Sequence, residues 1–355
     1  MANYTNNQNF PRANMEIWAA TDDKNSSGAA SAITDFSGKN RTLTAASAAP
    51  AYSTEILAGR GGVFFNGSNN PLAFTGAFNL KHAFILASYN PATFTANQGL
   101  LSGITGNPML VGEAGGSSKF IDSGFGANFR YRIMDVLLPN SNQLAPVGGK
   151  VALIEIQYTT GFFLDGIQIG QDRNLTARKW NGYFFELIGY SAIKDDYDRS
   201  QIYQYFARKF HVWQQSVEGL DIFPFPANHS RSKSTGRRFF ESEPYQGATA
   251  KLLRGARFST LEANYETRRE SEYTAALDFH AEHYGLRDFV FRDYKYYPPK
   301  DAAFAFTSDL KDAGGDISRL FNYGFSAKGA AAPSAPANAY GITISNDTDI
   351  FLIDR

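Results

Sequence analysis

The character of the chain changes between Gly219 and Pro226, and this change constrains the fold to two modules. Before it, short apolar runs alternate with turns rich in Gly, Asn and Ser; after it come a basic stretch, further strand-like runs and a helix. Pro224 and Pro226 suit an extended connector, because proline disfavours helix at its own position and at the residue before it. A chain of 355 residues has room for two domains. We therefore predict a first domain over 1–218, a linker over 219–226 and a second domain over 227–355.

The composition argues against several classes of protein. The formal net charge is zero, which gives no electrostatic reason to expect nucleic acid or an anionic membrane as a partner. The chain has no cysteine, so disulfides, cysteine nucleophiles and thiolate metal sites are excluded. Its N-terminus lacks the features of a signal peptide, and no apolar run approaches the ~20 residues of a membrane span. We expect a soluble protein that folds in a cytoplasm and has no membrane span.

The first domain reads as a set of short strands followed by one helix. Alternation and short apolar runs predict strands at 62–65, 83–89, 151–158 and 184–190. Asp165-Gly166 predicts a tight hairpin turn within 162–169, because this dipeptide accepts positive φ angles. A helix over 194–210 is predicted from Ile202, Phe206 and Phe210 on one face, with Asp195 or Asp196 as its N-cap. This pattern favours a β-sandwich closed by a helix.

The order of several short motifs in residues 12–213 resembles the laminin-G-like and concanavalin-A-like jelly rolls. The motifs are Ile17-Trp18, Asp35-Phe36-Ser37-Gly38-Lys39-Asn40, Pro50-Ala51-Tyr52, Val63-Phe64-Phe65-Asn66-Gly67-Ser68, Leu164-Asp165-Gly166 and Glu186-Leu187-Ile188-Gly189-Tyr190. The resemblance implies a two-sheet sandwich that commonly binds glycans, often as an accessory module.

Two strand carboxylates raise the question of catalysis. Glycosidases need two carboxyl groups that face one cleft, one as acid and one as nucleophile or base. Glu155 and Glu186 each occur singly in a predicted strand, and the paired Glu-x-Asp-x-x-Glu pattern is absent. We therefore interpret both as solvent-facing residues and predict no enzymatic activity and no catalytic residue.

For binding, the candidates are Trp180, Asn181 and Asp172. Trp180-Asn181 stands where a loop passes into a strand, and sugar sites often combine an aromatic platform with a polar amide. The alternative, which we favour, is that Trp180 packs the edge of the sandwich. A second alternative is a calcium site of loop carboxylates from Asp122, Asp165 and Asp172. These carboxylates are not clustered in the sequence, so we expect no metal and no cofactor.

In the second domain we predict a strand over 256–267, a helix over 270–284 and a strand over 288–294. His280 and His283 lie three residues apart on that helix, whereas the zinc-protease motif requires four, so we interpret them as structural or surface residues. The basic stretch from 228 to 257 contains Arg231, Lys233, Arg237, Arg238, Lys251, Arg254 and Arg257 against Glu241 and Glu243. We interpret it as a solvated or inter-subunit face rather than a nucleic-acid site.

Residues 224–298 resemble the minor or distal tail proteins of long-tailed bacteriophages. The resemblance rests on Thr235-Gly236-Arg237-Arg238, on a strand that ends Tyr265-Glu266-Thr267, on Leu277-Asp278-Phe279 in the helix, and on Phe289-Val290-Phe291-Arg292-Asp293-Tyr294. It implies a small β-sandwich or barrel with one packed helix, assembled as a ring at the end of the tail tube. Such proteins act through subunit interfaces rather than an active site.

The last residues, 301–355, depart from this pattern and their role stays open. Residues 302–306 are a strand candidate, and 340–345 with 350–353 predict a terminal hairpin. An apolar last strand of this kind is able to extend the sheet of a neighbouring subunit.

Together, the two resemblances imply a structural protein of a phage tail tip that carries a lectin-like domain. Its partners would be other tail proteins, further copies of itself in a ring, and host-cell glycans, and its location would be the virion tail. The alternative is a free-standing lectin or a carbohydrate-binding accessory module. A glycoside hydrolase with an unrecognised acid pair is a third interpretation.

Overall fold

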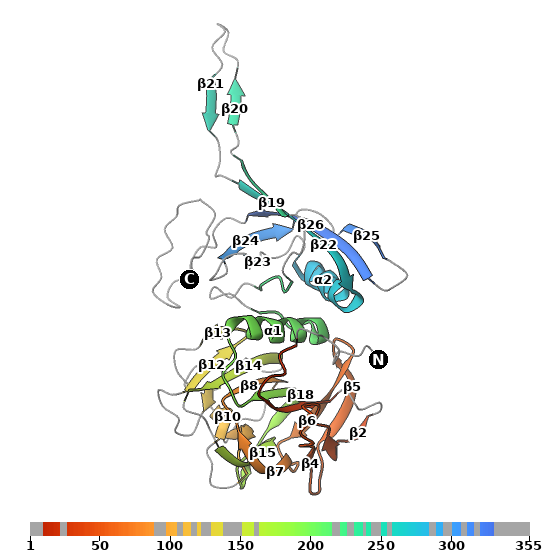
Figure 1. Cartoon of the computed structure of the whole chain (residues 1–355), viewed down its shortest axis with the longest axis vertical. Helices are drawn as coiled ribbons and strands as arrows, with labels where there is room; N and C mark the ends of the chain where they lie inside the picture. The colour runs from red at the N-terminus through yellow and green to blue at the C-terminus, as the bar shows by residue number, and fades with distance from the viewer. Residues whose placement is uncertain are drawn as a thin grey trace. The chain divides into compact units, whose positions relative to one another are not determined.

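The computed structural model describes residues 10–21, 27–88, 97–104, 109–114, 119–121, 129–137, 151–159, 163–214, 221–225, 231–236, 239–242, 250–253, 258–283, 289–293, 300–306, 311–315 and 320–329. These residues form antiparallel sheets and two helices (Figure 1). The mainly-β fold class predicted from the sequence is confirmed. The chain divides into two compact units, Met1–Phe206 and Ala207–Arg355. The division falls inside helix α1 (Asp196–Phe210), earlier in the chain than the predicted linker.

Nine strands form the larger sheet of the first unit, sheet A. They are β1 (Met15–Ala20), β2 (Gly28–Ala29), β5 (Ala51–Leu57), β6 (Arg60–Asn66), β8 (His82–Ser88), β12 (Phe129–Ile133), β13 (Val136–Leu137), β14 (Val151–Tyr158) and β18 (Asn181–Tyr190). Their order is β13-β12-β14-β8-β18-β6-β5-β2, and β1 pairs with β18. The four predicted strands of this domain fall on β6, β8, β14 and β18.

Seven strands form the second sheet of this unit, sheet B. They are β3 (Ala32–Ile33), β4 (Leu43–Thr44), β7 (Leu72–Asn79), β9 (Gln98–Ser102), β10 (Met109–Ala114), β11 (Lys119–Ile121) and β15 (Phe163–Ile169), in the order β11-β10-β9-β15-β7-β4-β3. The strands β16 (Gln171–Asp172) and β17 (Leu175–Lys179) pair only with each other among the described strands.

The main core lies between sheets A and B, and sheet A is buried on its other face as well. Along β8, Ala83, Ile85 and Ala87 belong to the core cluster that sheet B also supplies. The alternate residues His82 and Phe84 are also fully buried, on the opposite face of the sheet. A strand buried on both faces reads as a continuous apolar run, which is why β8 shows no polar alternation.

Helix α1 covers the outer face of sheet A. The side chain of Asp195 caps it, with its Oδ1 accepting the N–H of Asp198 at 2.8 Å. Arg208 and Lys209 lie in its last turn, where positive charge stabilises the helix dipole. The residues predicted to share its apolar face, Ile202, Phe206 and Phe210, are all fully buried.

The predicted hairpin at Asp165-Gly166 is wrong, because both residues lie inside the continuous strand β15. The glycine is required there for a different reason. A Cβ at Gly166 would lie 2.5 Å from the carbonyl oxygen of Phe74 and 2.4 Å from Cδ1 of Ile104. The close approach of β7, rather than a turn, therefore selects glycine at this position.

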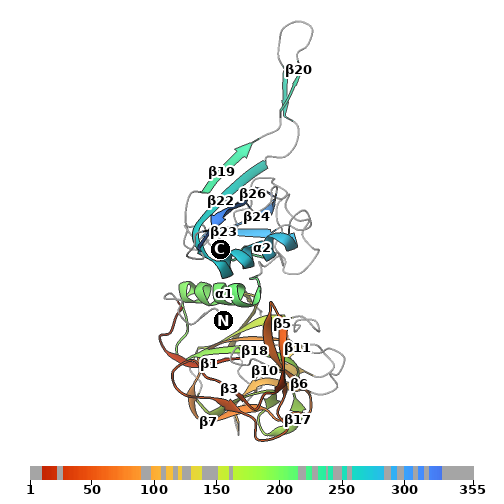
Figure 2. The same ribbon diagram turned by 90° about the vertical axis from the view of Figure 1, so that its right-hand side faces the viewer.

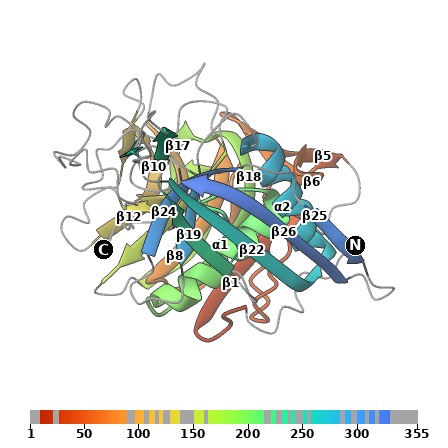
Figure 3. The ribbon, with the colours of Figure 1, turned by 90° about the horizontal axis from the view of Figure 1, so that it is seen from above.

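The second unit is built on one six-stranded sheet, sheet E. Its strands are β19 (Arg231–Gly236), β22 (Phe258–Arg269), β23 (Phe289–Asp293), β24 (Lys300–Phe306), β25 (Lys311–Gly315) and β26 (Leu320–Gly329). The order is β19-β22-β26-β24-β23, and β25 pairs with β26. Figure 3 shows the long strands β22 and β26 side by side. The strands predicted over 256–267, 288–294 and 302–306 fall on β22, β23 and β24.

Part of the basic stretch forms a two-stranded ribbon, while Arg231 and Lys233 lie in β19 of sheet E. The strands β20 (Phe239–Ser242) and β21 (Ala250–Leu253) pair with each other and with no other described strand. Both side views show this ribbon extending away from β19 and β22 (Figures 1 and 2). An isolated two-stranded hairpin is marginally stable in water, so the ribbon is a natural surface for contact with another chain.

Helix α2 (Glu270–His283) matches the helix predicted over 270–284 and packs on β22, β24 and β26. The described part of the predicted linker, 221–225, belongs to this unit and is mostly buried. Phe223 contacts the ring of Phe279 in α2, with 5.2 Å between ring centroids. Pro224 is therefore part of a packed segment.

Candidate functional site

Two carboxylates that the sequence singled out, Glu155 and Glu186, lie buried on the outer face of sheet A. The expectation that they face solvent is wrong: each has no exposed surface. The reason is helix α1, which covers this face of sheet A. Side chains on this face are therefore buried between the sheet and the helix.

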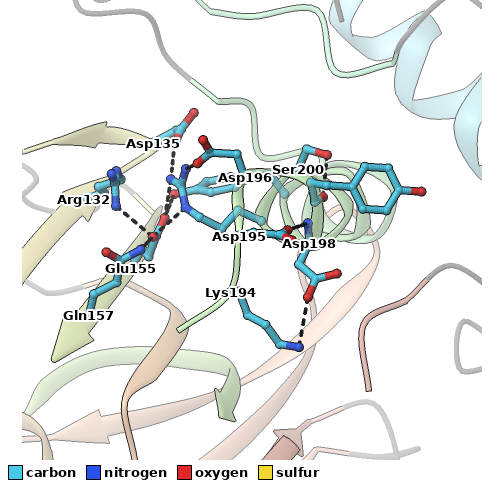
Figure 4. A network of polar contacts seen from close by, with 12 residues as sticks. Arg132, Asp135, Glu155, Gln157, Lys194, Asp195, Asp196, Asp198 and Ser200 are labelled. Carbon is cyan, nitrogen blue, oxygen red and sulfur yellow. Dashed lines mark hydrogen bonds and ion pairs between the residues drawn. The ribbon is translucent and has the colours of Figure 1, made fainter. Parts of the chain in front are cut away.

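Glu155 in β14 is the centre of a network of polar contacts (Figure 4). Arg199 of α1 binds it in a fork, with Nε donating to Oε1 and Nη2 to Oε2, both at 2.8 Å. The hydroxyl of Tyr203, one turn later, donates to Oε2 at 2.9 Å. Gln157 and Arg132 donate to Oε1 at 2.8 and 3.1 Å. The network fixes the helix to the sheet through one buried carboxylate.

His82 completes the network, and its hydrogen bonds define its tautomer. Its Nδ1 accepts the backbone N–H of Lys194 at 3.0 Å, so this nitrogen carries no proton. The proton therefore lies on Nε2, which donates to Oε1 of Glu155 at 3.0 Å. His82 is neutral in this arrangement and joins the residue before α1 to the centre of the network.

The network shifts the pKa values of its members. Burial alone would raise the pKa of Glu155, but the hydrogen bonds from His82 and Arg199 outweigh it and hold the pKa well below its ordinary 4.5. Burial lowers the pKa of His82 below 6.5, against the opposing effect of Glu155. Burial also raises the pKa of Tyr203 well above 10, and the negative charge of Glu155 adds to this effect. The stable state is an ionised carboxylate with a neutral imidazole and a neutral phenol.

Glu186 in β18 has a separate set of partners. Its Oε1 accepts Trp18 Nε1 from β1 at 2.5 Å and the hydroxyl of Tyr205 from α1 at 2.7 Å. Phe10 stacks on Trp18 with 4.8 Å between ring centroids and also contacts Tyr205 at 5.0 Å. This second carboxylate joins β1, β18 and α1 through aromatic side chains.

The geometry of the two carboxylates does not fit a glycosidase pair. The strands β14 and β18 flank β8 on either side, so their backbones are about 10 Å apart. A retaining pair requires carboxyl groups about 5 Å apart, and either mechanism requires a cleft that reaches both. Glu155 accepts hydrogen bonds on both oxygens and Glu186 is enclosed by aromatic rings. These two groups stabilise the fold and do not form an acid–base pair.

The predicted sugar platform is not exposed. Trp180 is 1% exposed and belongs to the core cluster between the sheets. Asn181, the first residue of β18, is buried beside it, and its backbone N–H donates to Gln98 Oε1 at 2.9 Å. Neither side chain offers a face to a sugar in this structure.

Asp172 is also buried, but it lies under two arginines that reach the surface. Its Oδ1 accepts Nε of Arg173 at 2.8 Å, and its Oδ2 accepts Nη2 of Arg173 at 3.2 Å and Nη1 of Arg178 at 3.0 Å. The structure therefore separates the three candidates: Trp180 and Asn181 belong to the interior, whereas Asp172 holds a surface corner made by β16 and β17.

The metal alternatives have no structural counterpart within the described residues. No group of three His, Asp or Glu side chains there is arranged to hold a metal ion. Of the three proposed calcium ligands, Asp122 lies outside the described residues, and Asp165 accepts the N–H of Ile104 at 3.3 Å.

In the second unit, the polar side chains of α2 hold the segment that enters this unit. Glu272 accepts Arg208 Nη1 and Glu282 accepts Trp213 Nε1, both at 2.9 Å. His283 is buried, with its Nδ1 2.7 Å from the carbonyl oxygen of Phe279 and its Nε2 3.2 Å from Asp221. His283 is thus a structural residue, as the sequence interpretation expected.

Sequence reasoning missed Arg199, Tyr203 and Arg173. For the first two a signal exists, because their spacing of four places them on one helix face beside the apolar Ile202 and Phe206. A charged residue on the apolar face of a helix indicates a buried partner. For Arg173 no comparable signal is present, since a turn arginine is ordinary.

Comparison with known proteins adds little. No family model matches the sequence, and no curated protein matches it. Among solved structures, a sialidase of Trypanosoma rangeli in complex with 2,3-difluorosialic acid aligns at 11% identity over 56% of this chain and 34% of its own, with a TM-score of 0.36. This chain thus spans about a third of the sialidase. The binding domain of botulinum neurotoxin DC in complex with rat synaptotagmin II aligns at 10% identity over 90% and 95%, with a TM-score of 0.28. At such scores neither structure shows a shared fold, and nothing about its ligand is transferred.

No helix among the described residues is long and apolar enough to cross a membrane.

Proposed function

We propose that this chain is a structural protein of a long-tailed bacteriophage virion, a distal or minor tail protein. Its second unit assembles at the tail tip with further copies and other tail proteins, and its first unit is a jelly-roll module that contacts host glycans at the surface. The chain folds in the host cytoplasm and works through its surfaces, without enzymatic activity or a cofactor.

The observation that carries this proposal is a difference between sheet edges in the two units. In the first unit, the strand paths of sheets A and B end in β2, β3 and β13 of two residues each, and β11 of three. The remaining one-sided strand of sheet A, the six-residue β1, is wholly buried, and its backbone is bonded by Asp35 and Phe36. Short edge strands offer few open backbone groups to another chain. In the second unit, sheet E ends in β19 of six residues and β23 of five, beside the separate ribbon of β20 and β21. Longer edges support strand pairing between subunits.

Electron microscopy and light scattering of the full-length protein test the assembly role. We expect rings or a defined oligomer whose mass rises with protein concentration. A charge placed on the edge strand, Val290→Lys in β23, is expected to lower the oligomer mass, because edge lysines oppose strand pairing. The matched control is Ala29→Lys in β2, an exposed residue at an edge of sheet A. Circular dichroism confirms that both variants fold.

Two results would contradict the proposal. One is a monomer at every concentration that also fails to join tail particles in a lysate of infected cells. The other is an equal loss of oligomer mass in both lysine variants. This result would show that the edge of sheet E in the second unit contributes no more to assembly than the edge of sheet A.

The alternative function is that of a free-standing lectin. It is favoured by the first unit, in which sheets A and B enclose a core of their own. Binding to a glycan array by a discrete monomer, with no assembly under any condition, would select this alternative. Release of reducing sugar from a bound glycan would instead identify a glycoside hydrolase.

A further inference from the structure

The corner between β16 and β17 places an arginine in an uncommon backbone conformation. Arg173 has a φ of 51°, in the left-handed region that non-glycine residues rarely adopt. Strain of this kind persists only when the surrounding structure enforces it, and it is concentrated at functional sites. The contacts of Arg173 show how it is enforced.

Buried polar side chains converge on the backbone of Arg173. Its N–H donates to Ser102 Oγ at 2.9 Å. Its carbonyl oxygen accepts Gln171 Nε2 at 2.8 Å and also Gln168 Nε2. Ser102, Gln168 and Gln171 are all buried. Burying polar groups is costly unless they are hydrogen-bonded, and here their bonds fix one surface residue.

Gly99 of β9 belongs to the same construction. A Cβ at this position would lie 2.3 Å from the backbone nitrogen of Asp172 and 2.5 Å from its Cα. Any side chain at Gly99 would therefore push the corner outward. Glycine allows the corner to lie directly on sheet B.

The buried carboxylate of Asp172 orients two guanidinium groups at the surface. Asp172 has no exposed surface, while the side chains of Arg173 and Arg178 are 26% and 37% exposed. The bonds to Asp172 use Nε and Nη2 of Arg173 and Nη1 of Arg178, which leaves further N–H groups of each fork for a ligand. In the described part of the chain, neither arginine forms an ion pair with any other carboxylate.

The local charge is positive and the neighbouring groups are polar. Lys179 follows Arg178 in the chain and donates to the backbone oxygen of Ser68 at 2.9 Å, a neutral partner. Arg173 and Arg178 thus share one carboxylate, and Lys179, in the same strand as Arg178, adds a third positive charge. Asn174 and Thr176, between the two arginines, are exposed and able to bond to hydroxyl groups.

We propose that Arg173 and Arg178 form a binding site for an oxyanion group, a carboxylate or a phosphate, carried by a polysaccharide. Planar guanidinium forks match the geometry of both groups, and a fork already oriented by a buried carboxylate loses little freedom on binding. Asp172 acts as a positioning residue that does not touch the ligand. This inference rests on the proposed recognition role of the first unit and gives that unit a ligand class.

Calorimetric titration of the full-length protein tests the site. The probes are galacturonate oligomers for the carboxylate, glycerol phosphate oligomers for the phosphate, and neutral dextran as a reference. We expect one of the anionic probes to bind, dextran to fail, and added salt to weaken binding because the contacts are ionic. Binding to dextran with equal affinity, or no binding of either anionic probe, overturns the proposal.

Matched variants distinguish specific binding at this site from non-specific attraction by the positive charge of the protein. Arg178→Gln removes one fork while Arg173 still pairs with Asp172, and roughly tenfold weaker binding is expected. Arg130→Gln, an exposed arginine in β12, has the same charge change and is expected to bind like the wild type. Equal losses in the two variants would show non-specific attraction and refute the site.

Gly99→Ala tests the positioning without changing any charge. The added methyl group displaces the corner, so the affinity is expected to fall although both arginines remain. Wild-type affinity in a folded Gly99→Ala protein would overturn the role of the fixed corner. Failure of any of these binding tests leaves the ring-forming proposal standing, because assembly is measured separately by microscopy.

Discussion

At the scale of single residues, Glu155 illustrates how a buried charge acts in this fold. Five side chains donate to its two oxygens, and three of them, Arg132, Arg199 and His82, carry or can acquire positive charge. A buried ion pair contributes little compared with a packed apolar pair, but removal of one partner leaves the other uncompensated. The network therefore adds little to the free energy of unfolding, but the loss of any one charged partner should lower that free energy strongly.

This sensitivity predicts the effect of Glu155→Gln. Loss of the negative charge leaves Arg199 without its fork partner, and the free energy of unfolding should fall by about 3–5 kcal/mol. The chain has three tryptophans, of which Trp18 and Trp180 lie in the first unit. In a Trp213→Phe background, urea titration followed by fluorescence reports this unit alone.

The control for Glu155→Gln uses the same arginine. Asp196 also pairs with Arg199, at 3.0 Å, but its side chain is 68% exposed. Exposed pairs contribute about 0–1 kcal/mol, so Asp196→Asn should leave the urea midpoint nearly unchanged. Equal effects of the two substitutions would show that burial is not what makes Glu155 important.

The same network predicts acid sensitivity. The folded-state pKa of His82 is below its ordinary 6.5, so its contribution to stability is present above pH 6.5 and is lost as the pH falls. Glu155 adds a second loss once the pH falls below its ordinary 4.5. Protonation of His82 at Nδ1 would also oppose the N–H of Lys194.

Urea midpoints measured between pH 7.5 and pH 5 test the first of these losses. The midpoint for the first unit should decrease over this range in the wild type and change less in His82→Gln. Parallel pH profiles for the two proteins would assign the acid sensitivity to other groups.

At the scale of elements, helix α2 depends on one ring. Phe279 is fully buried, stacks on His283 with 4.0 Å between ring centroids, and contacts Trp213 and Phe223 edge-on. Phe279→Ala should therefore reduce the stability of the second unit by about 3–5 kcal/mol.

Leu277, two residues earlier on the same helix, provides the control. It is 37% exposed, so Leu277→Ala should cost less than about 0.5 kcal/mol. Trp213 fluorescence follows this unit because its ring lies 5.3 Å from that of Phe279. A red shift of the Trp213 emission is expected in Phe279→Ala only, and an identical spectrum in both variants would argue against this packing.

Both helices could be predicted from the sequence because their signals are local. An acidic cap precedes α1, and each helix has an apolar stripe of helical period. The strand Val151–Tyr158 was equally clear from its apolar run. The prediction at Asp165-Gly166 failed because glycine is selected both by tight turns and by the close approach of a neighbouring strand. The sequence alone does not distinguish these two causes.

The candidate site was less predictable because it depends on contacts distant in sequence. Whether a strand glutamate faces water depends on what covers the sheet, and α1 begins about forty residues after Glu155. Trp180 shows the converse: its sequence context fits a sugar platform, and only the second sheet places it in the core. Asp172 was identified as a candidate, but its arginine partners require the geometry of the β16–β17 corner.

At the scale of the whole molecule, balanced charge and open edges in the second unit favour association. The formal net charge is zero, so copies of the chain do not repel one another strongly. The terminal segment 340–355 lies outside the described residues, and its predicted role as a strand for a neighbouring subunit stays a prediction.

Removal of residues 340–355 tests this role. The shortened protein should show a lower oligomer mass by light scattering, while its urea midpoint for the first unit stays unchanged. Wild-type oligomerisation after the truncation would contradict a contribution of this segment to assembly.

The placement of α1 has a consequence for inheritance. Its first turns carry Arg199 and Tyr203, which hold sheet A, while Arg208 in its last turn and Trp213 just beyond it bind α2. A genetic exchange that replaces the first unit keeps all of these pairs together when its join falls between codons 205 and 208, because Tyr205 still binds Glu186 and Arg208 still binds Glu272. A join before Tyr203 or after Arg208 separates matched partners and should require compensating changes.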